Sequence, residues 1–184
     1  PIGYRTVPGV QYGMGLSTSW KNFEFNILFQ GSGKCDFFIG GNGPHAFRNG
    51  QTGNILQTMV DDNRWIPSEI SGDVSTENPN ANWPRLTWGN NDNNNQKSTF
   101  WLRDGRYIRL KNIELRYNVP TTFTRKFFVS NMQIGFIGEN LHTWSPFKLW
   151  DPENATTDEK NSGVRSGNAY PINRTYSCYI KLSF

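Results

Sequence analysis

The residues most suited to catalysis or metal binding are few in this chain and stand apart. The two histidines, His45 and His142, have no cysteine or carboxylate near them at the spacing of a metal site or a catalytic triad. The two cysteines, Cys35 and Cys178, are distant in sequence and form neither a metal-binding pair nor a predicted disulfide. We therefore expect no enzyme, no metal and no cofactor, and we expect both histidines to be structural or solvated.

Acidic residues at two places in the loops have the right chemistry to hold a cation. They are Asp61–Asp62 and the pair Asp151 and Glu153 beside Trp150. Carboxylates scattered in loops are usually solvated, so we predict no metal site at either place.

Tryptophans are the remaining candidates for ligand binding. Trp65, Trp83 and Trp88 lie among Asn and Asp residues in one long loop region. Such a composition is able to stack on a sugar ring and to hydrogen-bond its hydroxyls, so we name these three as the candidate residues for contact with a substrate or partner. The alternative is that they pack within the loop or against a partner protein.

Strands are the elements that must position these residues, because apolar and polar side chains alternate with a period of two. The first two segments, 12–20 and 23–32, are joined by a two-residue turn at Lys21–Asn22 and predict a hairpin. Its Gly-x-Gly sequences do not lead into a helix, so they are not phosphate-binding loops and instead indicate a close backbone approach. The other predicted strands cover 98–119, 131–143 and 174–184.

The predicted strand 98–119 is the longest of the five and would reach about 70 Å at roughly 3.3 Å per residue. The phase of its alternation shifts by one residue near Lys111–Asn112, which predicts a bulge. Its length exceeds the 9–11 residues that cross a bilayer, so we expect part of it to stand above the membrane.

The connections between the predicted strands differ greatly in length. Those at 21–22 and 120–130 are short, whereas 33–97 and 144–173 are long and rich in Gly, Asn and Pro. We expect a short helix over 54–63 but otherwise no regular structure in the first long connection, which argues against a compact soluble domain. Short and long connections fall at opposite ends of the strands, as in an outer-membrane barrel with long extracellular loops.

The composition agrees with such a barrel. Only 35% of the 184 residues are hydrophobic, and aromatic rings are abundant, with 7 Trp, 7 Tyr and 13 Phe. The sequence contains no run of 18 apolar residues, but that test does not detect membrane strands. The net charge of +4 comes from singly scattered Lys and Arg, which argues against nucleic-acid binding. We assign Trp20 and Trp144 to the aromatic girdle at the membrane interface.

Several motifs occur in an order that resembles the C-terminal part of SusC/RagA-type TonB-dependent outer-membrane receptors. These motifs are FEFNILFQGS at 23–32, NRW at 63–65, ENPNANWPRL at 77–86, STFWLRDGRYIRLKNIELRYNVP at 98–120, IGFIGENLHTWS at 134–145, LWDPE at 149–153 and YPINRTYSCYIKLSF at 170–184. Together they cover most of the chain, and the ordered set is far more specific than any one of them.

The resemblance implies an all-β fold, in which antiparallel up-and-down strands form the last five strands of a 22-stranded barrel. Residues 1–184 would then be a fragment that lacks the N-terminal plug. The resemblance also implies import of oligosaccharides or peptides across the outer membrane of a Gram-negative bacterium, with a SusD-like lipoprotein and energy from the TonB complex. On the final strand, it implies that Tyr176, Ile180, Leu182 and Phe184 form the signal for the barrel assembly machinery and face outer-membrane lipid.

Two other classes of protein stay open at this point. One is a soluble carbohydrate-binding β-sandwich, in which the Trp-rich loop is the site and the apolar faces form a core. That fold would bury Phe23, Phe25, Ile113, Leu115 and Ile180 against a second sheet. The other class, a passive porin, is disfavoured because the ordered motifs resemble a plugged family.

Overall fold

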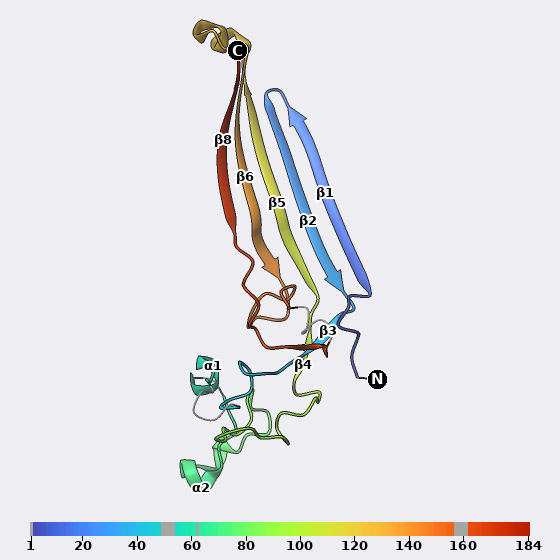
Figure 1. Ribbon diagram of the computed structural model, residues 1–184, viewed down its shortest axis with the longest axis vertical. Coiled ribbons are helices and arrows are strands. Elements are labelled where there is room, and N and C mark those ends of the chain that lie inside the picture. Colours follow the sequence, from blue (N-terminus) through green and yellow to red (C-terminus); the bar gives the residue numbers. More distant parts are fainter. Residues whose placement is uncertain (1, 49–53, 62, 157–161) are drawn as a thin grey trace. The chain divides into compact units, whose positions relative to one another are not determined.

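The computed structural model describes residues 2–48, 54–61, 63–156 and 162–184 (Figure 1). The chain divides into two compact units. The strand unit contains Val7–Cys35, Asp104–Asn154 and Tyr170–Phe184, and the loop unit contains Pro1–Thr6, Asp36–Arg103 and Ala155–Ala169. Each unit is assembled from segments that are distant in sequence. Most of the loop unit comes from the two long connections between strands of the strand unit.

The strand unit is a five-stranded antiparallel sheet in the order β1-β2-β5-β6-β8 (Figure 1). Its strands are β1 (Val10–Trp20), β2 (Phe23–Gly33), β5 (Tyr107–Val119), β6 (Asn131–Trp144) and β8 (Thr175–Ser183). Each strand neighbours the one that precedes it in this unit, which confirms the predicted up-and-down topology. The sheet is open, and β1 and β8 are its edges.

The short connections lie at one end of the sheet, as expected. Trp20 pairs with Phe23 across the tight turn, where Lys21 adopts a left-handed backbone with φ of 52°. The second connection contains α3 (Thr121–Thr124) and the 3-10 helix η3 (Arg125–Phe127), and the C-terminus lies at this same end (Figure 1). The prediction that short and long connections fall at opposite ends of the strands is therefore confirmed.

The predicted strand 98–119 is not continuous, and this expectation was wrong. The segment forms a turn, then β4 (Leu102–Asp104), and only from Tyr107 does it join the large sheet as β5. At the break, the Asp104 carboxylate accepts a hydrogen bond from the Arg106 N–H at 2.9 Å, and the Gly105 N–H donates to the distant Cys35 carbonyl at 2.8 Å. At 13 residues, β5 reaches about 43 Å rather than about 70 Å.

The bulge that the alternation predicts is present at Lys111. Against β2, Leu110 pairs with Phe29 and Asn112 with Leu28, so Lys111 has no opposite residue. The register against β6 also shifts between Leu110 and Asn112. Because an inserted residue restores the phase of the pleat, the apolar side chains before and after it share one face.

The loop unit contains its own small sheet, in the order β4-β3-β7, with β3 at Asp36–Ile39 and β7 at Val164–Arg165. Between β3 and β4, the described residues form three short helices: α1 (Gln57–Asp61), α2 (Ser68–Ser71) and the 3-10 helix η2 (Val74–Thr76). The helix predicted over 54–63 is thus present with shorter bounds. None of the helices in the described residues is long and apolar enough to cross a membrane.

The first long connection was expected to be almost structureless, and this expectation was wrong. The loop unit contains a hydrophobic core drawn from distant positions in sequence. Its buried members include Phe37, Ile39, Met59, Trp83 and Trp101. A stretch with few apolar residues can still pack when the residues it has are large and aromatic, because each ring buries much surface.

Candidate functional site

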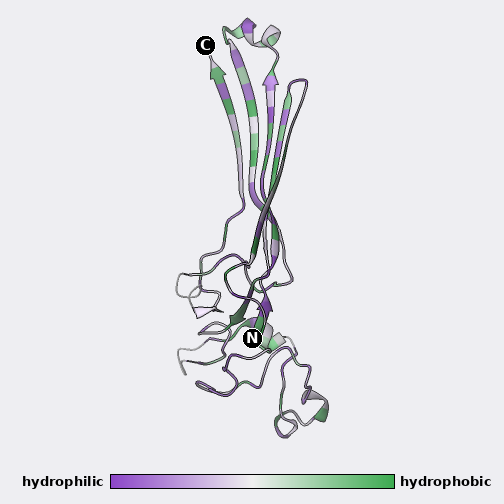
Figure 2. Ribbon diagram, turned by 90° about the vertical axis from the view of Figure 1, so that its right-hand side faces the viewer, coloured by the Kyte–Doolittle hydropathy of each residue, from purple (hydrophilic) through white to green (hydrophobic). Residues whose placement is uncertain are grey.

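One face of the large sheet is apolar across all five strands, and we call it the apolar face. Directly paired residues share a face, so the register lines up Trp20, Phe23, Tyr117, Ile134 and Ile180 in one row. Neighbouring rows add Leu16, Phe25, Ile27, Ile113, Leu115, Phe136, Tyr176 and Leu182. Figure 2 shows hydrophobic and hydrophilic residues alternating along these strands.

The side chains of the apolar face are accessible rather than covered. Met14 is 68% exposed, Leu16 is 59% exposed and Ile180 is 63% exposed. Large aliphatic side chains in such numbers on one continuous surface are unusual for a protein surface in water. Within the strand unit no second sheet packs on this face among the described residues.

The opposite face is a hydrogen-bonded polar network centred on Arg116. Its guanidinium lies 3.1 Å from Glu24 and 3.1 Å from Glu114. Amide and hydroxyl groups on neighbouring strands extend the network to Asn26, Asn118, Gln133 and Tyr179. Most of these contacts join residues on different strands. The network therefore connects β2, β5, β6 and β8 on this face.

Glycines on this sheet leave space for aromatic rings. A Cβ on Gly135 of β6 would collide with the ring of Tyr179, its neighbour on β8. A Cβ on Gly31 of β2 would lie 2.5 Å from both the Tyr12 ring and the Tyr107 carbonyl. The Tyr12 hydroxyl donates to that same carbonyl at 3.1 Å. Of the glycines in the Gly-x-Gly sequences, Gly31 thus shows the predicted close approach, to tyrosines of the chain itself, whereas Gly33 would have no atom within 4 Å of an added Cβ.

A buried ion pair fixes the segment that follows β6. The Arg109 side chain is 1% exposed, and its Nη2 lies 2.6 and 2.7 Å from the two carboxylate oxygens of Asp151. Glu153 lies 3.3 Å from the Arg109 Nη1. The expectation that Asp151 and Glu153 are solvated was wrong, because they neutralise a charge from a strand that is distant in sequence. The expectation of no metal site at this place is unaffected.

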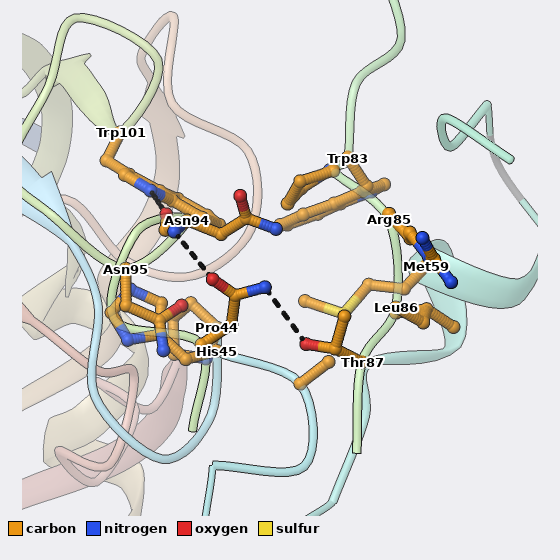
Figure 3. Close-up of a pocket in the computed structure, with 13 residues that line it drawn as sticks. Pro44, His45, Met59, Trp83, Arg85, Leu86, Thr87, Asn94, Asn95 and Trp101 are labelled. Atoms are coloured by element: carbon orange, nitrogen blue, oxygen red, sulfur yellow. Dashed lines mark hydrogen bonds between the residues drawn. The ribbon is translucent and has the colours of Figure 1, made fainter. Parts of the chain in front are cut away.

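The first cavity of the loop unit lies between Trp83 and Trp101 (Figure 3). It has a volume of about 20 Å³, room for about one water molecule. The Trp101 indole N–H donates to the Asn94 carbonyl at 2.6 Å, and the Asn91 amide donates to the Thr87 hydroxyl at 3.3 Å. This space is too small for a sugar ring.

The three candidate tryptophans do not converge on one surface. Trp83 is buried, with its ring centroid 6.3 Å from that of Trp101. Trp65 is half-buried, and its backbone N–H bonds the Trp83 carbonyl at 2.9 Å. Trp88 is 69% exposed and stacks at 5.2 Å on Phe47. Of the three, Trp88 alone offers most of its ring to a ligand, and the assignment of all three stays a prediction.

His45 is the residue that sequence reasoning underrated. Its side chain is buried and meets Trp101 edge-on, with the ring centroids 5.0 Å apart. Burial, helped by the positive charge of Arg48, lowers the pKa of His45 from 6.5 to about 4, so the ring is neutral at physiological pH. Beside it lies a second cavity of about 190 Å³. The other histidine, His142, is exposed on β6 beside Trp144.

Among the described residues, no group of three or more His, Cys, Asp or Glu side chains is placed to hold a metal ion. Asp62 lies outside the described residues, so the expectation for Asp61–Asp62 stays a prediction. Cys35 is buried and Cys178 is exposed on β8, and the two do not form a disulfide with each other.

Two curated receptors match nearly the whole chain. TonB-dependent receptor P26 of Formosa agariphila is 28% identical over 182 residues, which cover 97% of this chain and 17% of that receptor. TonB-dependent receptor P3 of the same organism is 27% identical over 186 residues, which cover 96% of this chain and 16% of that receptor. No family model matches the chain.

The fold is similar to solved structures of the RagAB peptide importer. In its "open-open" state the match has a TM-score of 0.68 and 21% identity, over 98% of this chain and 18% of that chain. In its "closed-closed" state the TM-score is 0.69, over 100% of this chain and 18% of that chain. The resemblance to SusC/RagA-like TonB-dependent receptors is confirmed.

The chain spans about a sixth of the length of the curated receptors it matches. These relatives are receptors and importers, which agrees with the expectation that the chain is not an enzyme. The predicted all-β fold, with five antiparallel strands that match part of a TonB-dependent receptor barrel, is confirmed.

The other residues assigned from the sequence lie on β1, β6 and β8 or directly after β8. Trp20 ends β1 beside the tight turn, and Trp144 ends β6 at the other end of the sheet. Tyr176, Ile180 and Leu182 project from β8 onto the apolar face, and Phe184 follows that strand and is exposed. Their assignment to the girdle and to the assembly signal stays a prediction.

Proposed function

We infer that this chain supplies five membrane-spanning strands and two extracellular loops to an outer-membrane nutrient transporter of the TonB-dependent type. The observation that carries the proposal is the uncovered apolar face of the five-stranded sheet. Lipid is the environment that makes this surface favourable, because a bilayer core accepts apolar side chains and offers no hydrogen bonds. The polar network on the other face would line the interior of the barrel.

The dimensions of the sheet support a membrane-spanning role. The strands contain 9–14 residues, and 9–11 tilted residues cross a bilayer. On β1, Tyr12 and Trp20 are eight positions apart, or about 26 Å along the strand. Tyr12 lies in the same row of paired residues as Trp144. Tilt shortens this span to about 20 Å across the membrane, close to the apolar band of about 25 Å between aromatic girdles. Trp20 and Trp144 would then mark the two interfaces.

The proposed barrel also gives a role to the two sheet edges and to the last strand. β1 and β8 each pair on one side only in the part of the chain that the structure describes, and further strands of a complete barrel would satisfy their free edges. Tyr176, Ile180, Leu182 and Phe184 would face lipid and form the signal for the barrel assembly machinery. Residues 1–184 would be the C-terminal segment of the receptor, with its plug elsewhere in the protein.

The transporter would work with a SusD-like surface lipoprotein and draw its energy from the TonB complex. The similarity to RagAB, a peptide importer, supports peptides as one substrate class. Oligosaccharides are the second class, supported by the Asn-rich surroundings of the partly exposed Trp65 and Trp88. A soluble sandwich is not supported, because Phe23, Leu115 and Ile180 are exposed and no second sheet packs on them within the strand unit.

The test is uptake by cells that make the complete receptor. Cells that lack its gene should lose uptake of one class of labelled nutrient, supplied as oligosaccharides in one arm and as peptides in the other. Uptake should return with the gene and stop when a protonophore removes the energy supply of the TonB complex. Recovery of the receptor in the soluble fraction, or unchanged uptake of every nutrient tested, would contradict the proposal.

A further inference from the structure

The second cavity of the loop unit is lined by two basic side chains and a buried histidine. Its volume is about 190 Å³, and its lining includes Gly40, His45, Arg48, Lys97 and Trp101. All of these residues belong to the loop unit, so the cavity is defined within that unit alone. Ligand pockets for drug-sized molecules span about 300–1,000 Å³, so this one fits a single sugar or amino-acid residue.

The ring of His45 lies at the wall of this cavity with both nitrogens unused. The side chain is 6% exposed, yet Nδ1 and Nε2 are buried without a hydrogen-bond partner among the described residues. The Nε2 edge lies against Gly40, where an added Cβ would be 3.3 Å from that nitrogen. A neutral imidazole has one donor and one acceptor, and leaving both unsatisfied in a buried place is costly. Because solvent reaches neither nitrogen, the neutral ring serves as an uncharged wall of the cavity.

The charges around the cavity select the kind of ligand. Arg48 and Lys97 both line it, and none of the described lining residues is acidic. The Lys97 ammonium donates to the Ser162 carbonyl at 3.1 Å and lies 5.8 Å from the ring centroid of Phe38. These two contacts hold the ammonium in place, and an ammonium has three donors, so others remain for a ligand. Two cations with no carboxylate favour an anion.

We propose that this cavity binds a carboxylate. Arg48 and Lys97 bind the carboxylate, and the uncharged His45 ring forms part of the wall. Two kinds of nutrient share this chemistry: the acid group of a uronic acid beside its hydroxyls, and the terminal carboxylate of a peptide beside its last amide N–H. The cavity is too small for a longer oligomer, so it recognises the end of a substrate.

This proposal rests on the proposed function, because it names the group by which a nutrient is recognised. Calorimetry on the complete receptor purified in detergent tests it without transport. Galacturonate and an N-acetylated dipeptide with a free carboxylate are the two probes, and galactose and the corresponding dipeptide amide are their neutral controls. We expect one acid to bind at least about tenfold more tightly than its neutral control, since hydrogen bonds to charged groups are the strong ones.

Variants assign the binding to this cavity. Arg48→Gln and Lys97→Gln change exposed side chains, so the fold should persist. Each substitution should weaken binding of the acidic probe by about tenfold or more. Arg85→Gln removes another exposed cation, which lines the smaller cavity instead, and should leave affinity unchanged. Equal affinity for acid and neutral probes, or equal effects of the three variants, would overturn the proposal. Tight binding without uptake by cells would overturn the transport function and leave this site intact.

Discussion

Replacing Asp151 by Asn should release the segment that follows β6 from the sheet. Arg109 is almost fully buried, and both of its short contacts go to the two carboxylate oxygens of Asp151. Glu153 lies farther away, at 3.3 Å, and its nearest oxygen makes no hydrogen bond with good geometry among the described residues. Removing one partner of a buried ion pair costs about 3–5 kcal/mol. Because Glu153 still compensates part of the Arg109 charge, we expect a cost of about 3 kcal/mol.

Hydrogen exchange measured by mass spectrometry on the complete receptor reports this local loss. Residues 145–154 should open more often, and a cost of about 3 kcal/mol corresponds to exchange that is roughly a hundredfold faster. Asp104→Asn is the matched control, because its partner Arg106 is 67% exposed and such surface pairs contribute at most about 1 kcal/mol. The same small change in both variants would refute the reasoning that Arg109 anchors this segment.

Three further predictions follow from single residues. Gly135→Ala should reduce the yield of folded receptor because its Cβ collides with the Tyr179 ring, whereas Gly33→Ala, with no atom within 4 Å of the new Cβ, should not; equal heat-modifiable mobility on gels would contradict this. His45 has a folded pKa of about 4, below its unfolded 6.5, so the unfolded state binds more protons between these values. The stability of the loop unit should therefore fall by up to about 3 kcal/mol as the pH drops from 6.5 to 4. If the rate of proteolysis depends on pH to the same extent in His45→Phe as in the unchanged receptor, His45 is not the cause. Phe184→Asp should lower the amount of folded receptor in the outer membrane, and unchanged surface proteolysis would count against its role in assembly.

The sheet could be predicted from sequence because its information is local. Alternation of apolar and polar residues marks each strand, and a shift of phase marks the bulge at Lys111. The start of β5 at Tyr107 could not be predicted in this way. That strand begins after the point where the Gly105 N–H bonds the carbonyl of Cys35, a contact between residues far apart in the chain.

The candidate site was harder to predict, for the same physical reason. The sequence around Trp83 is rich in polar residues, as in a ligand-binding loop. In the fold, however, its ring packs against Trp101 in a core that forms only when the loops fold. Asp151 has the sequence of a solvated loop carboxylate, but its partner is Arg109 on another strand. His45 gave no sequence signal at all, since its importance lies in burial and in two unpaired nitrogens.

The apolar face is the central claim, and Cys178 allows a direct test because it lies exposed on that face. In the complete receptor in lipid, a nitroxide on Cys178 should be relaxed by oxygen, which concentrates in the bilayer, more than by a water-soluble nickel complex. A nitroxide at Ser177→Cys, in a Cys178→Ser background, should show the reverse, because it faces the opposite side of β8. Equal accessibility of both labels to the nickel complex, or protection of Cys178 from both agents, would contradict a lipid-facing sheet.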